Sequence, residues 1–259
     1  MSRTRPARST GSSAASRRVR YQLVDCRWEL GKPGRGRELY LERHIPGASF
    51  LDVESDLSAP PSTPGGRHPL PAEHDFARAA GAAGIGQGVL VVAYDQGMNG
   101  GAARLWWLLR HFGHDDVAVL EGGIGAWLGP FRAGEEAIEP SEFVPRLRGG
   151  DTIEADELAE RLGDPGLAVV DARLPERYRG EVEPIDPVAG RIPGARNQPF
   201  PEALAPELLK AEEIVAYCGS GITAAVVLLR LAQAGRDDAK LYPGSWSDWC
   251  GRGLPAETG

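Results

Sequence analysis

A lone cysteine, Cys218, stands between an apolar run and a glycine-rich turn in the segment VAYCGSGITAAVVLLRLA, residues 215–232. Glycines such as Gly219 and Gly221 let successive backbone N–H groups converge on one point, and a following helix adds the positive end of its dipole. Both features favour a thiolate, the nucleophilic form of cysteine. The alternative is that Cys218 is only a small buried apolar side chain, as many free cysteines are.

The flanking segments predict the elements that would position this thiol. LAVVDAR (167–173) and EEIVAYC (212–218) are short β-branched runs that end in polar residues, as buried parallel strands do. ITAAVVLLRLAQAG (222–235) has the length of a helix and ends at a glycine, and so does AARLWWLLRHFG (102–113). The local plan is strand, turn, helix, with Cys218 at the carboxyl end of a strand.

The two halves of the chain repeat one another, which decides the architecture. Four blocks of the first half recur in the same order in the second half: LVDCRW (23–28) as VVDAR (169–173), ERHIPGASFLDV (42–53) as GRIPGARNQPF (190–200), VVAYDQGMNGGAARLWWLLRHFG (91–113) as IVAYCGSGITAAVVLLRLAQAG (214–235), and LEGGIGAW (120–127) as YPGSWSDW (242–249). The first half carries an insertion between its second and third blocks. Asp95 stands where the second half has Cys218, so the fold does not need a thiol there.

The repeat gives a domain layout with a basic extension in front of it. Residues 21–130 and 151–259 each form one α/β domain, joined by a linker at 131–150 that is rich in Gly, Pro and charge. Residues 1–20 hold six arginines, much serine and no acid. A transit peptide has this composition, but a disordered tail is the favoured interpretation.

Composition excludes several classes of protein. The 259 residues are 42% hydrophobic with a net charge of −7, which offers no general attraction for nucleic acid or anionic lipid. No apolar run approaches the roughly 18 residues of a membrane span. Three cysteines without a CxxC pair favour a reducing, cytoplasmic setting over a disulfide framework or a thiolate zinc site. GIGQG (84–88) does not match the dinucleotide motif GxGxxG, so no dinucleotide cofactor is expected. No metal is expected either, because the chain has no CxxC pair.

Taken together, six motifs carry a resemblance to a known family: RHIPGA (43–48), DAR (171–173), RYRGEVEP (177–184), IPGA (192–195), CGSGIT (218–223) and GSWSDW (244–249). Over nearly all of residues 21–259 the chain resembles the two-domain rhodanese family, which includes thiosulfate and 3-mercaptopyruvate sulfurtransferases. The resemblance implies two tandem rhodanese-like domains, each a mostly parallel sheet flanked by helices, of which the first is catalytically silent. It also implies that Cys218 forms a persulfide, stabilised by the backbone of the loop residues Gly219, Gly221, Ile222 and Thr223.

The resemblance also bears on the sulfur donor. Neutral residues directly after the cysteine, here Gly219 and Ser220, are typical of the mercaptopyruvate enzymes. Arg177 aligns with the first arginine that holds the substrate carboxylate in that type, and a guanidinium suits a two-point grip on a 2-oxo acid. The second such arginine falls at Asp186, so Arg191 is the candidate to compensate. This departure leaves thiosulfate open as the donor.

Some members of the family place an acid and a histidine from the first domain near the substrate. Matching FLDVE and HPLP assigns these positions to Glu54 and His68. A relay of Ser220, His68 and Glu54 would protonate the leaving enolate. The alternative for His68 is a surface residue of a Pro/Gly-rich loop. Thioredoxin, another small thiol or cyanide could accept the sulfur.

Two rival interpretations use the same loop. A cysteine phosphatase needs an arginine six positions after its cysteine to hold phosphate, and that position is Ala224. The same mismatch weighs against arsenate reduction. A rhodanese-like module that carries sulfur or binds a partner without turnover would also keep Cys218, but Arg177 favours the enzyme.

Overall fold

Residues 20–97 and 99–259 are described by the structure, a computed structural model. The tail predicted at residues 1–20 therefore lies outside the described residues, except for Arg20. None of the described helices is long and apolar enough to cross a membrane.

The N-terminal half contains one parallel sheet of four strands in the order β2-β1-β3-β4. Its elements along the chain are β1 (Arg20–Asp25), α1 (Arg35–Glu42), β2 (Ser49–Phe50), α2 (Glu73–Ala82), β3 (Val89–Tyr94), α3 (Gly101–His111), β4 (Val117–Val119) and the short 3-10 helix η1 (Gly123–Ala126).

The C-terminal half contains a second parallel sheet with the equivalent order β6-β5-β7-β8. Its elements are α4 (Ala155–Glu160), β5 (Leu167–Asp171), α5 (Pro175–Tyr178), β6 (Arg196–Asn197), the 3-10 helix η2 (Pro206–Lys210), β7 (Glu213–Tyr217), α6 (Ala224–Gln233), β8 (Lys240–Leu241) and α7 (Ser245–Gly251). The two sheets also share a register, since Asp25 pairs with Tyr94 as Asp171 pairs with Tyr217. The predicted repeat and the α/β class are confirmed.

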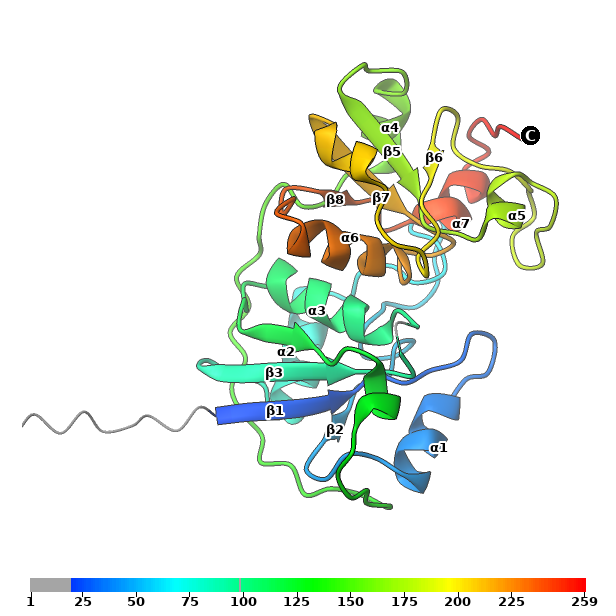
Figure 1. Ribbon diagram of the computed structural model, residues 1–259. Coiled ribbons are helices and arrows are strands. Elements are labelled where there is room, and N and C mark those ends of the chain that lie inside the picture. The colour runs from blue at the N-terminus through cyan, green and yellow to red at the C-terminus, as the bar shows by residue number, and fades with distance from the viewer. Residues whose placement is uncertain (1–19, 98) are drawn as a thin grey trace, which may run out of the picture.

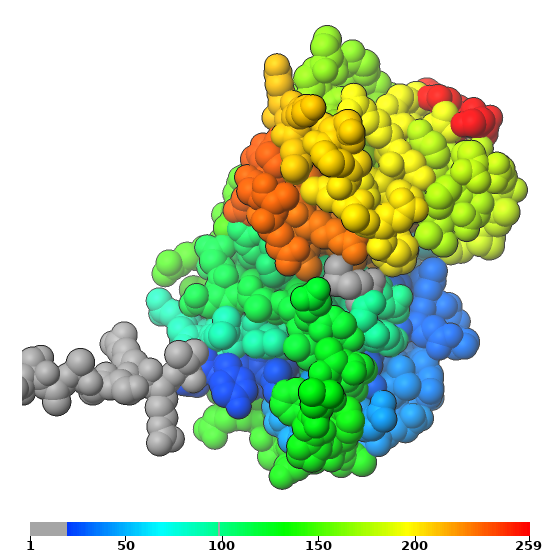
Figure 2. Space-filling model, in the orientation of Figure 1, coloured from blue at the N-terminus to red at the C-terminus, as the bar shows by residue number. Residues whose placement is uncertain are grey.

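Helices α3 and α6 lie side by side between the two sheets (Figure 1). Nearly every residue of α3 is buried, as expected for a helix with a sheet on one side and another helix on the other. One apolar cluster runs through both halves and includes Leu105 and Leu108 of α3 together with Leu228 of α6. Figure 2 shows the two halves as lobes in broad contact. Because the contact is apolar and continuous, it holds the halves in one arrangement.

The segment predicted as a linker, residues 131–150, holds no helix or strand. It runs along the N-terminal half, where the Ser141 N–H donates to the Gly81 carbonyl at 2.9 Å and the Arg146 N–H to the Phe112 carbonyl at 2.8 Å. The connection between the halves is therefore held in place by the N-terminal half.

The insertion predicted in the first half begins with a long loop, residues 51–72, between β2 and α2. This 51–72 loop reaches α7 of the C-terminal half. There the Gly65 N–H donates to Asp248 Oδ1 at 2.8 Å, and the Arg67 N–H donates to Ser247 Oγ at 3.1 Å. The extra residues of the first half thus serve to bring side chains to the second half.

Candidate active site

Cys218 lies directly after β7 and is 2% exposed. Its N–H donates to Ser245 Oγ at 3.1 Å, and its Sγ accepts a hydrogen bond of 3.1 Å from the N–H of Gly221. Gly221 has a φ of +83°, and a Cβ there would lie 2.6 Å from the Pro243 carbonyl oxygen, so only glycine fits. The predicted strand–turn–helix arrangement around the thiol is confirmed.

The equivalent loop of the N-terminal half shows what this cradle binds. Asp95 follows β3 as Cys218 follows β7, and its two carboxylate oxygens accept from the N–H groups of Gly97 at 2.8 Å and Ala102 at 3.2 Å. Both loops therefore direct N–H groups at an anion or potential anion. In the first half that anion is a carboxylate, which is a poor nucleophile beside a thiolate.

Cys218 opens onto a cavity of about 210 Å³ at the junction of the two halves. The lining comes from both: Trp28, Leu30, Arg67 and Asn99 from the first half, and Arg173, Leu174, Arg177, Phe200, Cys218, Gly219, Ser220, Ile222 and Thr223 from the second. The walls combine apolar side chains with guanidinium groups, the composition of a site for a small organic anion.

Arg177, at the end of α5, is the predicted carboxylate ligand and lines this cavity. Its Nε and Nη2 donate to Glu183 at 3.2 and 2.6 Å, and Nη2 also donates to Asp186 at 3.2 Å. Burial alone would raise the pKa of the Glu183 carboxyl, but hydrogen bonds and charge from Arg177, together with the N–H groups of Asp186 and Ile185, hold that pKa below its usual value. Two acids therefore fix the guanidinium on one side and leave Nη1 on the other.

Arg191 lies elsewhere. Its Nη2 pairs with Glu257, its Nη1 donates to the carbonyl oxygen of Gly259 at 2.7 Å, and its guanidinium stacks on Tyr178. It is absent from the cavity lining among the described residues. Arg191 anchors the C-terminal segment, so the structure does not place it where it could replace the arginine missing at Asp186.

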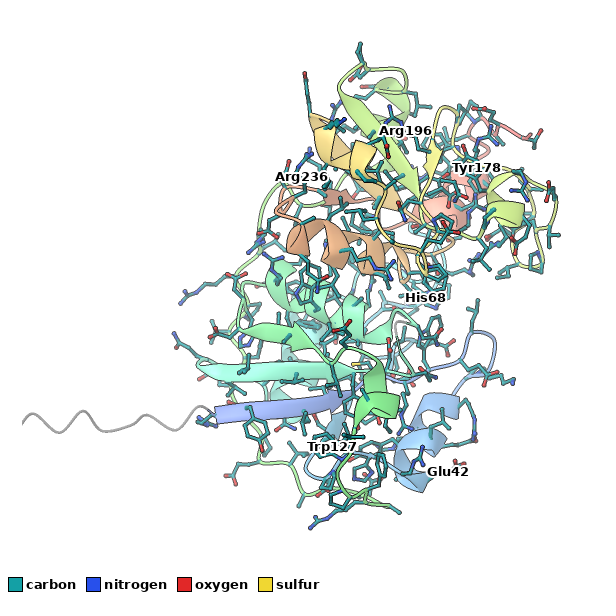
Figure 3. All side chains as sticks on the ribbon, in the orientation of Figure 1. Glu42, His68, Trp127, Tyr178, Arg196 and Arg236 are labelled. Carbon is teal, nitrogen blue, oxygen red and sulfur yellow. The ribbon has the colours of Figure 1, made fainter. Side chains whose placement is uncertain are left out.

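His68 and Ser220 are brought together across the boundary between the halves, where Figure 3 shows His68. His68 Nδ1 lies 2.7 Å from Ser220 Oγ. Burial, and then the positive charges of Arg104 and Arg67, lower the pKa of His68 to about 4, so its imidazole is neutral at pH 7. Within residues 20–97 and 99–259, no hydrogen bond or ion pair joins Glu54 to His68, so the third member of the relay stays a prediction.

Two arginines of the first half also belong to the site and were missed from the sequence. Arg67 lines the cavity beside His68. Arg104 of α3 is fully buried, and it donates to the carbonyl oxygens of His68 at 3.1 Å and Gly221 at 3.2 Å. The signal for Arg104 was a charged residue with only small or apolar residues within four positions on either side of it, and adjacency to His68 was the signal for Arg67.

Comparison with known proteins shows which family the chain is similar to. The family described as "Rhodanese-like domain" matches residues 13–129 and 154–252. The chain is 44% identical to a probable 3-mercaptopyruvate sulfurtransferase of Pseudomonas aeruginosa, over 88% of each chain. It is 39% identical to the putative thiosulfate sulfurtransferase SseB of Mycobacterium tuberculosis, over 88% of this chain and 87% of that protein.

A solved structure agrees as well. The crystal structure of SseA from Escherichia coli, whose title concerns the fold and mechanism of 3-mercaptopyruvate enzymes, superposes with a TM-score of 0.74 at 32% identity. The match covers 88% of this chain and 93% of that one. The similarity therefore extends over both halves.

Proposed function

Since this chain belongs to the rhodanese family and is a sulfurtransferase, we propose that it takes sulfur from 3-mercaptopyruvate through a persulfide on Cys218. The observation that carries the proposal is the hydrogen bond from the Gly221 N–H to Cys218 Sγ, in a loop that opens onto a cavity lined by Arg177. This arrangement stabilises a thiolate beside a cationic binding group.

In the first step the Cys218 thiolate attacks the sulfur of the donor. The new S–S bond forms as the carbon–sulfur bond breaks, and the bonding electron pair leaves with carbon as the enolate of pyruvate. The thiol proton of the donor ends on that carbon. The products are pyruvate and a Cys218 persulfide anion, so charge and atoms balance without an added oxidant or reductant.

The enolate needs a proton route, and Ser220 with His68 supplies it. His68 is neutral at pH 7, and its Nδ1 lies within hydrogen-bonding distance of Ser220 Oγ, at 2.7 Å. The Ser220 hydroxyl, oriented by the neutral imidazole of His68, can give its proton to the enolate carbon while it takes up the proton of the donor thiol, which is general acid–base catalysis. Ser220 lines the cavity next to Cys218, within reach of the leaving group.

In the second step an acceptor thiolate or cyanide attacks the outer sulfur of the persulfide and regenerates the Cys218 thiolate. We propose a thiol such as that of thioredoxin as the acceptor. The first half of the chain contributes no nucleophile to this cycle, because the Asp95 carboxylate fills the equivalent loop. Its catalytic part is to supply His68.

Thiosulfate is the second candidate donor, favoured by a cavity that contains three arginines, Arg67, Arg173 and Arg177. The deciding experiment measures kcat/KM of the purified protein with 3-mercaptopyruvate and with thiosulfate, each with cyanide as acceptor. We expect a preference of at least about tenfold for 3-mercaptopyruvate, which corresponds to about 1.4 kcal/mol in transition-state binding. A preference for thiosulfate refutes the proposed donor, and turnover of neither favours a non-enzymatic sulfur carrier.

A further inference from the structure

Arg67 reaches the cavity from the N-terminal domain through contacts that fix its backbone. Its own N–H donates to Ser247 of α7, and the N–H of Gly65 donates to Asp248 of the same helix. A Cβ added to Gly66 would lie 2.6 Å from the Gly244 carbonyl oxygen, so the two domains touch backbone to backbone here. The position of the Arg67 guanidinium is therefore set by the C-terminal domain as well as by its own.

Asp186 holds Arg67 and Arg177 together. Arg67 Nη1 donates to one carboxylate oxygen of Asp186, and Arg177 Nη2 donates to the other at 3.2 Å. The Asp186 side chain is only 4% exposed. One buried carboxylate thus brackets a guanidinium from each domain, and the aspartate that replaces an expected arginine positions another arginine instead.

The opposite edges of both guanidinium groups converge next to the nucleophile. A Cβ built on Gly219 would lie 3.0 Å from Arg67 Nη2 and 3.3 Å from Arg177 Nη1. Within the described part of the chain, neither of these two nitrogens donates a hydrogen bond to any group. Arg67 Nε is buried and has no partner there either. Donors from two domains therefore lie around one point beside Cys218, unused by the protein itself.

We propose that Arg67 and Arg177 form a two-guanidinium clamp for the carboxylate of the sulfur donor, with Asp186 as the bracket that orients them. This inference rests on the proposed function and extends it, because it assigns substrate recognition to the N-terminal domain. Guanidinium pairs suit a carboxylate because each oxygen can accept from a separate planar group. The buried Arg104, which donates to backbone carbonyls and to no carboxylate in the described structure, adds positive charge behind the loop.

A purely structural role for Arg67 would be an ion pair that braces the domains through Asp186. The two roles differ in their dependence on the donor. 3-Mercaptopyruvate carries the carboxylate, whereas mercaptoacetone has the same ketone and thiol without it. Loss of an ion pair that only braces the domains would lower kcat/KM for both donors equally. Loss of a carboxylate clamp would lower kcat/KM for 3-mercaptopyruvate alone.

The test compares Arg67→Gln with the wild-type protein on both donors. We expect kcat/KM for 3-mercaptopyruvate to fall at least about tenfold, mostly through KM, and kcat/KM for mercaptoacetone to stay within about twofold. Arg67→Lys should recover part of the loss, since it restores a point charge without the planar fork. Arg179→Gln is the matched control, because Arg179 forms an exposed ion pair with Glu181 outside the cavity. Equal losses on both donors overturn the clamp.

A second readout does not need sulfur transfer. Alkylation of Cys218 by iodoacetate, which is anionic, is compared with alkylation by neutral iodoacetamide, and the Cys218 peptide is followed by mass spectrometry. We expect Arg67→Gln and Arg177→Gln each to lower the ratio of the iodoacetate rate to the iodoacetamide rate about tenfold, and Arg179→Gln to leave it unchanged.

The two readouts separate the two proposals. If the wild-type protein turns over no 3-mercaptopyruvate while Arg67→Gln lowers the alkylation ratio, the proposed function fails and the anion clamp stands. If 3-mercaptopyruvate is turned over but Arg67→Gln leaves the ratio unchanged, the clamp is wrong and the proposed function stands.

Discussion

The guanidinium of Arg104, on helix α3 of the N-terminal domain, donates a hydrogen bond of 3.2 Å to the carbonyl oxygen of Gly221 in the catalytic loop. The N–H of the same glycine donates to Cys218 Sγ. Arg104 also donates to the carbonyl oxygens of Leu57, His68 and Pro69. One buried cation therefore joins the 51–72 loop, which carries His68, to the loop that carries the thiol.

Replacing Arg104 by Met should cost both stability and turnover. Several buried carbonyls would lose a charged donor, while the penalty for burying a charge would disappear, so we expect a net loss of about 2 kcal/mol in the free energy of unfolding. We expect kcat to fall about tenfold because Gly221 is no longer held. Urea unfolding and steady-state kinetics measure the two effects. Arg110→Met, which alters a partly exposed ion pair on the same helix, is the control. A wild-type kcat in Arg104→Met would contradict the link to the loop.

Cys218→Ser should fold with wild-type stability and transfer no sulfur. A serine oxygen can accept the same N–H bond from Gly221, but it is far less nucleophilic than a thiolate. With 3-mercaptopyruvate and no acceptor, mass spectrometry should find one extra sulfur atom on the Cys218 peptide of the wild-type protein. Cys250→Ser is the matched control, because burial raises the pKa of the Cys250 thiol and keeps it protonated. Retained turnover in Cys218→Ser would refute the persulfide step.

The lowered pKa of His68 predicts how the free energy of unfolding depends on pH. Its pKa is about 4 in the folded protein and about 6.5 in an unfolded chain, so between these values the unfolded state binds more protons. The free energy of unfolding should therefore be unaffected by His68 above pH 6.5. As the pH falls toward 4, protonation of His68 in the unfolded chain should lower it by up to about 3 kcal/mol. His68→Gln should show a shallower decline in urea unfolding between pH 7 and pH 4.5. His74→Gln, which changes an exposed histidine, should keep the wild-type slope, and an equally steep slope in His68→Gln would contradict the assignment.

Local chemistry made part of this site predictable from the sequence. The cradle around Cys218 needs only a strand, a glycine turn and a helix in succession, and these follow from residues near one another in the chain. The repeat then predicted two α/β domains, and the structure shows that their two sheets have equivalent strand orders. Asp95 at the position equivalent to Cys218 indicated that the loop of the first half has no thiol, and the structure shows that the Asp95 carboxylate accepts the loop N–H groups instead.

Contacts between distant residues were not predictable in this way. Arg67 and Asp186 are 119 positions apart and meet only because the 51–72 loop crosses to the other domain. Arg191 was expected in the cavity because its charge could replace a missing one. Its backbone instead forms a bridge with Glu257 that holds the side chain near the C-terminus. The backbone pairing of Arg191, and not its charge, therefore determines where its side chain lies.

Gly219→Ala tests the space beside the nucleophile. The backbone of Gly219 lies outside the positive-φ region, so alanine is compatible with the fold, but its methyl group would lie 3.0 Å from Arg67 Nη2 and 3.3 Å from Arg177 Nη1. That methyl group would occupy the point where the two guanidinium groups converge. We expect KM for 3-mercaptopyruvate to rise about tenfold, a loss of about 1.4 kcal/mol in binding, with thermal stability unchanged.

The matched control for this variant is Gly125→Ala in the N-terminal domain, where an added Cβ meets no atom within 4 Å. Gly125→Ala should keep the wild-type KM. The persulfide-to-cyanide step should be unaffected in Gly219→Ala, since cyanide carries no carboxylate for the guanidinium groups to bind. A rise in KM therefore locates the effect in donor binding, whereas an unchanged KM would show that the carboxylate of the donor binds away from Gly219.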